Sequence, residues 1–76
     1  MALITNQVEW SGGVGPTRNV VVSGTGTATL QASDGDGGWV DVPDGLLTAP
    51  TVTDIYCAEG VTFRFTIVTA VVSLSS

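Results

Sequence analysis

The residues that could do chemistry are few, and two of them lie in one glycine-rich turn. Residues 34–38 read Asp-Gly-Asp-Gly-Gly. Carboxylate oxygens are ligands for Ca²⁺, and a pair of carboxylates can hydrolyse glycosides. A calcium loop normally adds a third oxygen side chain and a distant bidentate acid, and neither is present here. Turn chemistry alone explains Asp34 and Asp36, so we predict no metal ion and no cofactor.

A nucleophile with an activating base is missing from the sequence. The chain has no histidine or lysine, and its single cysteine, Cys57, has no basic neighbour in sequence that would lower its pKa. We interpret Cys57 as a small core residue within a strand. Acid–base and nucleophilic catalysis both need groups that can be activated. We therefore predict that the protein is not an enzyme and has no catalytic residues.

A second glycine-rich stretch, residues 11–17, reads Ser-Gly-Gly-Val-Gly-Pro-Thr and has the composition of a phosphate-binding loop. Phosphate-binding loops of that type end in Gly-Lys-Ser/Thr and join a strand to a helix, and neither feature accompanies this stretch. The three glycines and the proline are equally typical of an ordinary connection between strands. We interpret the stretch as such a loop.

The charge balance excludes several classes of partner. Seven acids against two arginines, Arg18 and Arg64, give a formal net charge of −5. Nucleic acids and anionic membranes are both bound by clusters of cations, so we predict neither as a partner. No signal peptide is visible, and the longest apolar stretch, residues 67–74, is shorter than the roughly 18 residues of a membrane helix. We expect synthesis in the cytoplasm with a reduced cysteine.

A period of two along the chain predicts β-strands. In residues 25–33, polar residues alternate with Gly26, Ala28, Leu30 and Ala32, as in a strand with one wet and one buried face. A strand resumes at Trp39, which predicts a hairpin over residues 25–42 with a five-residue loop. The glycines at 24 and 26 favour a bulge or a bend. Further strands are predicted over residues 2–10, 18–23, 51–58, 61–68 and 71–75, with turns at 43–45 and 59–60.

About seven short strands and no segment of helical periodicity predict an all-β fold. We expect a single domain over residues 1–76, built as a small antiparallel β-sandwich or jelly-roll-like barrel. Trp39 is expected to close one end of the core, and Val72 and Leu74 to point inward. The other predicted core residues are Val20 or Val22, Leu30, Val40, Val42, Ile55, Phe63, Phe65 and Ile67.

The small core predicts a need for neighbouring subunits. A chain of 76 residues buries only about 60% of its unfolded surface, and one cysteine excludes an internal disulfide. Oligomerisation is then the remaining source of stability. We expect residues 1–8 to pair with a strand of the same chain, of a sister subunit or of another protein. The predicted interface comprises Met1, Leu3, Ile4, Trp10, Leu46 and Leu47.

Three motifs in residues 24–65 follow one another in a recognisable order. A strand of the form Thr-Leu-Gln-x-Ser runs through the glycine/aspartate turn into Trp-Val-Asp-Val. A Leu-Thr-Ala-Pro segment follows, and later an acid-glycine turn leads into Val-Thr-Phe-Arg-Phe. In this order the motifs resemble small virion proteins of tailed bacteriophages, which occur alone in heads and tails and as parts of larger fibre proteins. The motifs that make up the resemblance imply no catalytic or metal-binding residues for this chain.

The resemblance implies a non-enzymatic virion structural protein, in particular a capsid decoration (cement) protein on the exterior of the particle. Its implied partners are the major capsid protein or other virion subunits, and copies of itself, as a trimer before a dimer. An outer position also suits the −5 charge, which would repel packaged DNA. A start at Met1 and an end soon after Ile67 favour a stand-alone protein.

Two alternatives to the decoration protein stay open on the sequence. One is a tail- or fibre-associated module that binds host glycans, with Trp10, Trp39 and Tyr56 as candidates for stacking on sugar rings. The other is a β-sandwich binding domain with an unknown partner. Trp10 could equally lie in a subunit interface, where tryptophan is enriched.

Overall fold

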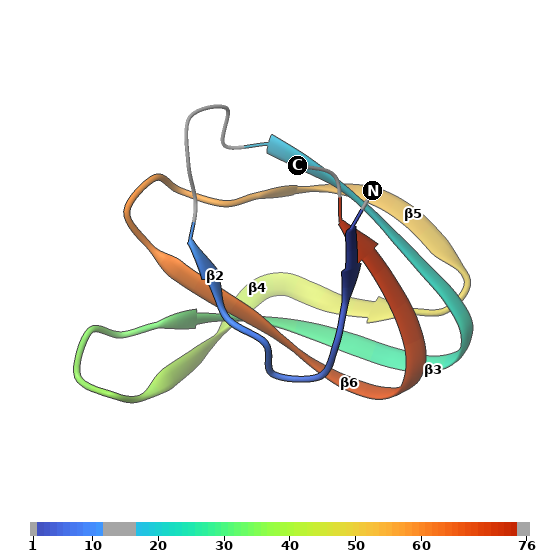
Figure 1. The fold of residues 1–76 in the computed structure, drawn as a ribbon, viewed down its shortest axis with the longest axis horizontal. Coiled ribbons are helices and arrows are strands. Elements are labelled where there is room, and N and C mark those ends of the chain that lie inside the picture. The colour runs from blue at the N-terminus through green and yellow to red at the C-terminus, as the bar shows by residue number, and fades with distance from the viewer. Residues whose placement is uncertain (1, 12–16, 75–76) are drawn as a thin grey trace.

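The computed structural model describes residues 2–11 and 17–74, and within them it contains strands and no helix (Figure 1). The predicted all-β fold is therefore confirmed. The six strands are β1 (Ala2–Ile4), β2 (Trp10–Ser11), β3 (Thr17–Ser33), β4 (Trp39–Thr48), β5 (Thr51–Tyr56) and β6 (Thr62–Leu74).

All six strands belong to one antiparallel sheet with β3 at its centre. On one side of β3, β6 pairs along most of its length. On the other side, β5 pairs with the first part of β3 and β4 with the second part. The short strands β1 and β2 pair one after the other with the far side of β6.

Both long strands bend at the same level, and this bend folds the sheet over. Gly24 and Gly26 have φ angles of 81° and 109°, and the β3–β6 register shifts between Gly24 and Ala28. A Cβ on Gly26 would lie 1.9 Å from the carbonyl oxygen of Val68, so only glycine allows the two backbones to approach so closely. Opposite it, Thr69 has a φ of 59°. The bend predicted at these glycines is confirmed.

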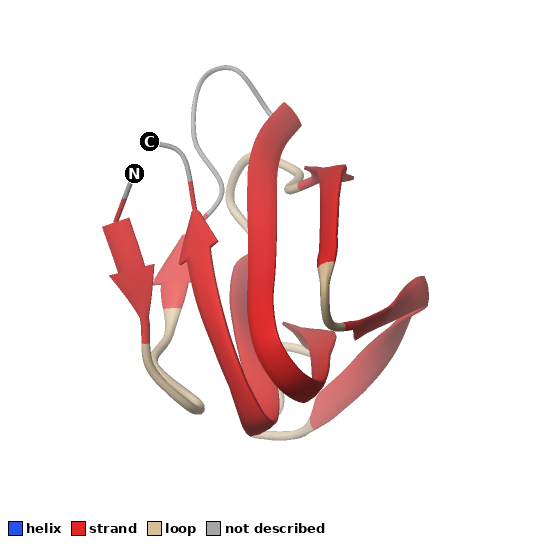
Figure 2. Cartoon of the chain, turned by 90° about the vertical axis from the view of Figure 1, so that its right-hand side faces the viewer, coloured by secondary structure: helices blue, strands red, loops and turns tan. Residues whose placement is uncertain are grey.

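The bend divides the sheet into two halves that face each other across the core (Figure 2). We call them the first half-sheet (β1, β5 and residues 17–24 and 70–74) and the second half-sheet (β2, β4 and residues 27–33 and 62–69). A single buried cluster joins them, because each half contributes its inward side chains to it. The cluster comprises Val20, Val22, Ala28, Leu30, Ile55, Cys57, Phe63, Phe65, Val72 and Leu74.

Two pairs of predicted short strands are in fact single long ones. Residues 18–23 and 25–33 belong to β3, which has 17 residues, and residues 61–68 and 71–75 largely coincide with β6, which has 13. The structure thus has six strands where about seven short ones were expected, and two of the six are long. Positive φ angles at Gly24 and Thr69 turn the chain, and the β3–β6 pairing shifts its register there and then resumes, so a local break in the sequence pattern is a bend and not an end.

The predicted N-terminal strand over residues 2–10 is interrupted. A turn separates β1 from β2, with a φ of 60° at Gln7 and a hydrogen bond from Val8 N to Thr5 O (3.2 Å). β1 pairs with the end of β6, and Gln7 N donates to Phe65 O (2.8 Å) before β2 resumes the pairing. Of the partners predicted for residues 1–8, the structure thus supplies a strand of the same chain. Met1 lies outside the described residues.

The predicted hairpin over residues 25–42 is confirmed, including its five-residue loop between Ser33 and Trp39. The predicted turn at residues 43–45 does not end a strand, because β4 continues through it as a bulge. Residues 42–45 lie opposite Leu30 alone, with Asp44 at a φ of 58°. The glycine loop predicted at residues 11–17 falls mostly on residues 12–16, which lie outside the described residues.

Most of the predicted core is buried, with two exceptions. Val40 is 57% exposed, so its predicted burial was wrong. Trp39 belongs to the outer face of the second half-sheet and does not close the core. Both begin β4 at the loop end of the hairpin, where Trp39 pairs with Ser33 and Val40 with Ala32. The predicted residues that are buried are Val20, Val22, Leu30, Ile55, Phe63, Phe65, Val72 and Leu74, while Val42 and Ile67 pack half-buried against them.

Candidate binding surfaces

A hydrogen-bonded cluster covers the outer face of the second half-sheet. Gln31 lies at its centre because it pairs with Arg64 on one side and Asp41 on the other. Its Oε1 accepts bonds from Arg64 Nε (2.9 Å) and Thr66 Oγ1 (2.8 Å). Its Nε2 donates to Asp41 Oδ1 (2.8 Å). The amide of Gln31 therefore links three strands, and the only cation of this face is held by the sheet itself.

Arg64 also lies over the ring of Trp39, with its guanidinium carbon 4.3 Å from the ring centroid. This distance is within the range of a cation–π interaction. The contact covers one face of the indole, and Trp39 is half-buried as a result. Trp39 and Arg64 thus stabilise the base of the hairpin from outside the core.

The hairpin tip uses Asp34 for its own backbone. Asp34 Oδ1 accepts hydrogen bonds from the amides of Asp36 (2.7 Å) and Gly38 (3.0 Å), and Asp34 N donates to Gly38 O (3.1 Å). These bonds are those of an Asx-type turn. Within the described residues, no three His, Cys, Asp or Glu side chains gather as metal ligands would. The hydrogen bonds that Asp34 makes are therefore those of a turn.

The only thiol is buried beneath an aromatic cluster. Cys57 is fully buried, and burial raises the pKa of its thiol above the ordinary value of 9.0, more than the Trp10 indole N–H and the Arg18 charge lower it. The ring of Trp10 stacks against Phe63 and Phe65, with centroids 6.0 and 5.3 Å apart. An inaccessible, protonated thiol is a poor nucleophile. Cys57 occupies the core as predicted, but it follows the end of β5 and does not lie within a strand.

The outer face of the first half-sheet carries exposed apolar side chains among polar ones. Leu3, Val52, Tyr56 and Val71 all point away from the core, and their exposed fractions lie between 47% and 68%. They supply four of the eight large apolar side chains that are exposed among the described residues. The one acid on this face, Asp54, accepts a hydrogen bond from Asn19 Nδ2 (3.1 Å).

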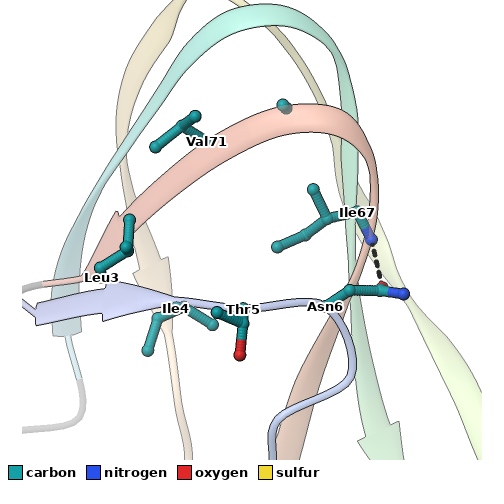
Figure 3. Close-up of a pocket in the computed structure, with 7 residues that line it drawn as sticks. Leu3, Ile4, Thr5, Asn6, Ile67 and Val71 are labelled. Atoms are coloured by element: carbon teal, nitrogen blue, oxygen red, sulfur yellow. Dashed lines mark hydrogen bonds between the residues drawn. The ribbon is translucent and has the colours of Figure 1, made fainter.

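A hollow of about 280 Å³ opens beside this face, between β1 and the bend of β6 (Figure 3). It exists because the N-terminal segment takes a shorter path than the bent strand beside it. Leu3, Ile67 and Val71 line the hollow, and Asn6 Oδ1 closes one end by accepting a bond from Ile67 N (2.8 Å). The lining of the hollow is mostly apolar, with Thr5 and Asn6 as its polar members.

The predicted interface residues do not form one surface. Leu3 and Leu46 are exposed, but they belong to different half-sheets. Ile4, Trp10 and Leu47 pack against the core instead. Met1 lies outside the described residues. Sequence reasoning missed Val52, Tyr56 and Val71 as exposed apolar residues, and it missed the Gln31 cluster, because both depend on which strands are neighbours.

No helix that could cross a membrane occurs in the described part of the chain. No family model, curated protein or solved structure matches the sequence or the fold.

Proposed function

We propose that the protein is a non-enzymatic structural protein of a tailed-bacteriophage virion, a decoration protein on the exterior of the capsid. The observation that carries the proposal is the order of motifs in residues 24–65, which resembles that of small virion proteins. In the fold these motifs build the β3–β4 hairpin and the strand beside it. The proposed partners are the major capsid protein and further copies of the chain, as a trimer.

The charge distribution supports an exterior position. All seven acids are exposed, so the net charge of −5 is presented to the surroundings and not neutralised within the fold. Many copies of such a surface beside packaged DNA would be repelled by its phosphates. The same repulsion is absent on the outside of a shell.

The state of the aromatic rings favours this proposal over a glycan-binding module. A sugar-stacking platform needs an aromatic face that is open to the ligand. Trp10 is stacked on Phe63 and Phe65, and Arg64 covers one face of Trp39. Of the three aromatic residues considered for this role, Tyr56 alone is more than half exposed.

Reconstitution on particles tests the proposal. Purified protein is added to virions whose own copy of the gene has been deleted, and occupancy is measured by electron cryomicroscopy. We expect ordered density on the outer surface of the shell and a slower release of DNA on heating. Density confined to the tail or fibres would favour the glycan-binding module, and the absence of any added density would contradict a virion role.

A pair of variants then locates the contact with the shell. Leu46 and Val40 both lie on β4 and are 63% and 57% exposed, so neither contributes to the core. If Leu46 is part of the interface, Leu46→Lys lowers occupancy at least tenfold, whereas Val40→Lys does not. Equal occupancy by the two variants would exclude Leu46 from the contact.

A further inference from the structure

The first half-sheet has two open edges, and they are unlike the edges of the second half-sheet. Among the described residues, β1 and β5 each pair on one side only. Exposed edges normally carry lysine, an internal proline or a bulge, which prevent pairing with another chain. β4 has both Pro43 and a bulge, and β2 has two residues. β5 has six regularly paired residues with no lysine, internal proline or bulge, and its one charged residue is Asp54; β1 is short, with three residues.

The two open edges carry matching side chains in one row of the sheet. Leu3 pairs with Ser73, Ser73 with Val21, and Val21 with Val52, so this row crosses all four strands. Its two ends are Leu3, 64% exposed, and Val52, 66% exposed. Both point to the outer face. Two apolar side chains opposite each other on neighbouring strands stabilise a sheet by about 0.2–1 kcal/mol per pair.

Strand direction permits the two edges to meet. The four strands of the first half-sheet alternate in direction, so β1 and β5 run opposite ways. Rotating a second copy about an axis parallel to the strands leaves the direction of each of its strands unchanged. It therefore places β1 of the second copy antiparallel to β5 of the first, and the antiparallel sheet continues without interruption.

From these edges we propose that copies of the chain associate head to tail into a closed ring, in which β5 of each copy pairs with β1 of the next. This inference rests on the self-association included in the proposed function. The inner face of the first half-sheet is already covered by the second half-sheet, so the outer face is the one left for contacts between copies, and in the proposed ring it turns toward the axis. Leu3 and Val52 then face each other across the junction, and Tyr56 and Val71 lie on the side of the sheet that faces the axis.

Electrostatics distinguish this ring from a two-fold dimer of β5 edges. Pairing β5 with itself would bring two copies of Asp54 into one short ladder, and like charges facing each other are destabilising. The described residues of β1, Ala2 to Ile4, carry no charged side chain. Pairing β5 with β1 therefore brings no like charges together in a molecule whose net charge is −5.

Cross-linking of the purified full chain tests the contact directly. Leu3 and Val52 of one chain are separated by three strand spacings, about 14 Å, which is too far for a disulfide, whereas facing residues of paired strands are within reach. On mild oxidation, Leu3→Cys/Val52→Cys is expected to form closed covalent rings of one size, with both introduced thiols consumed. The single variants are expected to remain one chain, since Cys57 is buried.

Each other result overturns the proposal. A covalent dimer of the Val52→Cys single variant would show β5–β5 pairing, and no cross-link in the double variant would show that the edges do not meet.

Light scattering measures the mass of the assembly as a second test. The natural chain is expected to have a multiple of the mass of one chain, Val52→Lys the mass of one chain, and the matched Val40→Lys the natural mass. A natural chain that stays monomeric up to millimolar concentration contradicts the ring.

These outcomes are separate from those of the particle experiment. A chain that is monomeric in solution and still decorates shells would refute the ring and leave the proposed function intact. A ring that forms in solution but binds no particle would support the ring and contradict the proposed function.

Discussion

The outer faces of the two half-sheets differ, although the same two long strands build both. On the second half-sheet, Gln31 links Arg64, Thr66 and Asp41, so the polar groups of that face find partners within the chain. On the outer face of the first half-sheet, Leu3, Val52, Tyr56 and Val71 are exposed, with polar residues between them. A face that is satisfied internally has little to gain from a partner, whereas an exposed apolar face gains from being covered. The difference separates a largely self-contained half, in which the exposed apolar residue Leu46 lies on the edge strand β4, from a half suited to self-association.

The largest effect is expected from Phe65→Ala, because Phe65 is fully buried in the one cluster that both half-sheets share. We expect a loss of about 3–5 kcal/mol in the free energy of unfolding, measured in urea. Val71→Ala, on the outer face of the first half-sheet, is the control. It should change the free energy of unfolding by less than about 0.5 kcal/mol in dilute protein. Tryptophan fluorescence follows both regions, with Trp10 in the core and Trp39 on the hairpin. Separate transitions for the two would contradict a single core.

Gly26→Ala tests the bend that creates the two half-sheets. The added Cβ would meet Val68 O at a φ of 109°, so we expect a loss of at least about 1–3 kcal/mol. Gly35→Ala is the matched control, because Gly35 also has a positive φ, 87°, but nothing lies within 4 Å of its Cβ position. It should cost less, as only backbone strain is involved. Equal losses for the two variants would mean that close approach at the bend is unimportant.

Gln31→Ala sharpens the contrast between the two outer faces. It removes the acceptor for Arg64 and Thr66 and the donor to Asp41 from a partly exposed site, so we expect a loss of about 1 kcal/mol. Val52→Ala removes apolar atoms from the other face and should cost less than about 0.5 kcal/mol when the protein is monomeric. Urea unfolding at low concentration measures both. A larger loss for Val52→Ala would reverse the assignment of the self-contained half.

The smallest effect concerns the hairpin tip. If Asp34 serves only the backbone of its turn, a chelator leaves the melting temperature unchanged. Asp34→Ala should still cost about 1 kcal/mol, because the amides of Asp36 and Gly38 lose their acceptor. Asp34→Asn keeps an acceptor oxygen and should cost less. A fall of several degrees on adding chelator would show that the loop binds a metal ion and is more than a turn.

Local pattern determined much of this protein. Alternation in residues 25–33 and the run of glycines and aspartates after it determined the hairpin, its loop length and the inward side of Leu30. These features depend only on the local backbone, namely on the period of two in a strand and on the tolerance of glycine for positive φ. The absence of histidine and lysine likewise limited the chemistry before any fold was known.

Only the tertiary structure decided which strands are neighbours. Gln31 and Arg64 are far apart in sequence and meet because β3 pairs with β6, and Leu3 and Val52 end one row because four strands share a register. The exposure of Val40 has the same origin, since its strand pattern is that of a core residue but no opposite half-sheet covers it. Alternation in the sequence shows which side chains share a face of the sheet, but not whether that face is covered. Which face is covered depends on the pairing of strands that are distant in sequence. The free energy of that pairing comes from many residues far apart in the chain, so a short stretch of sequence does not predict it.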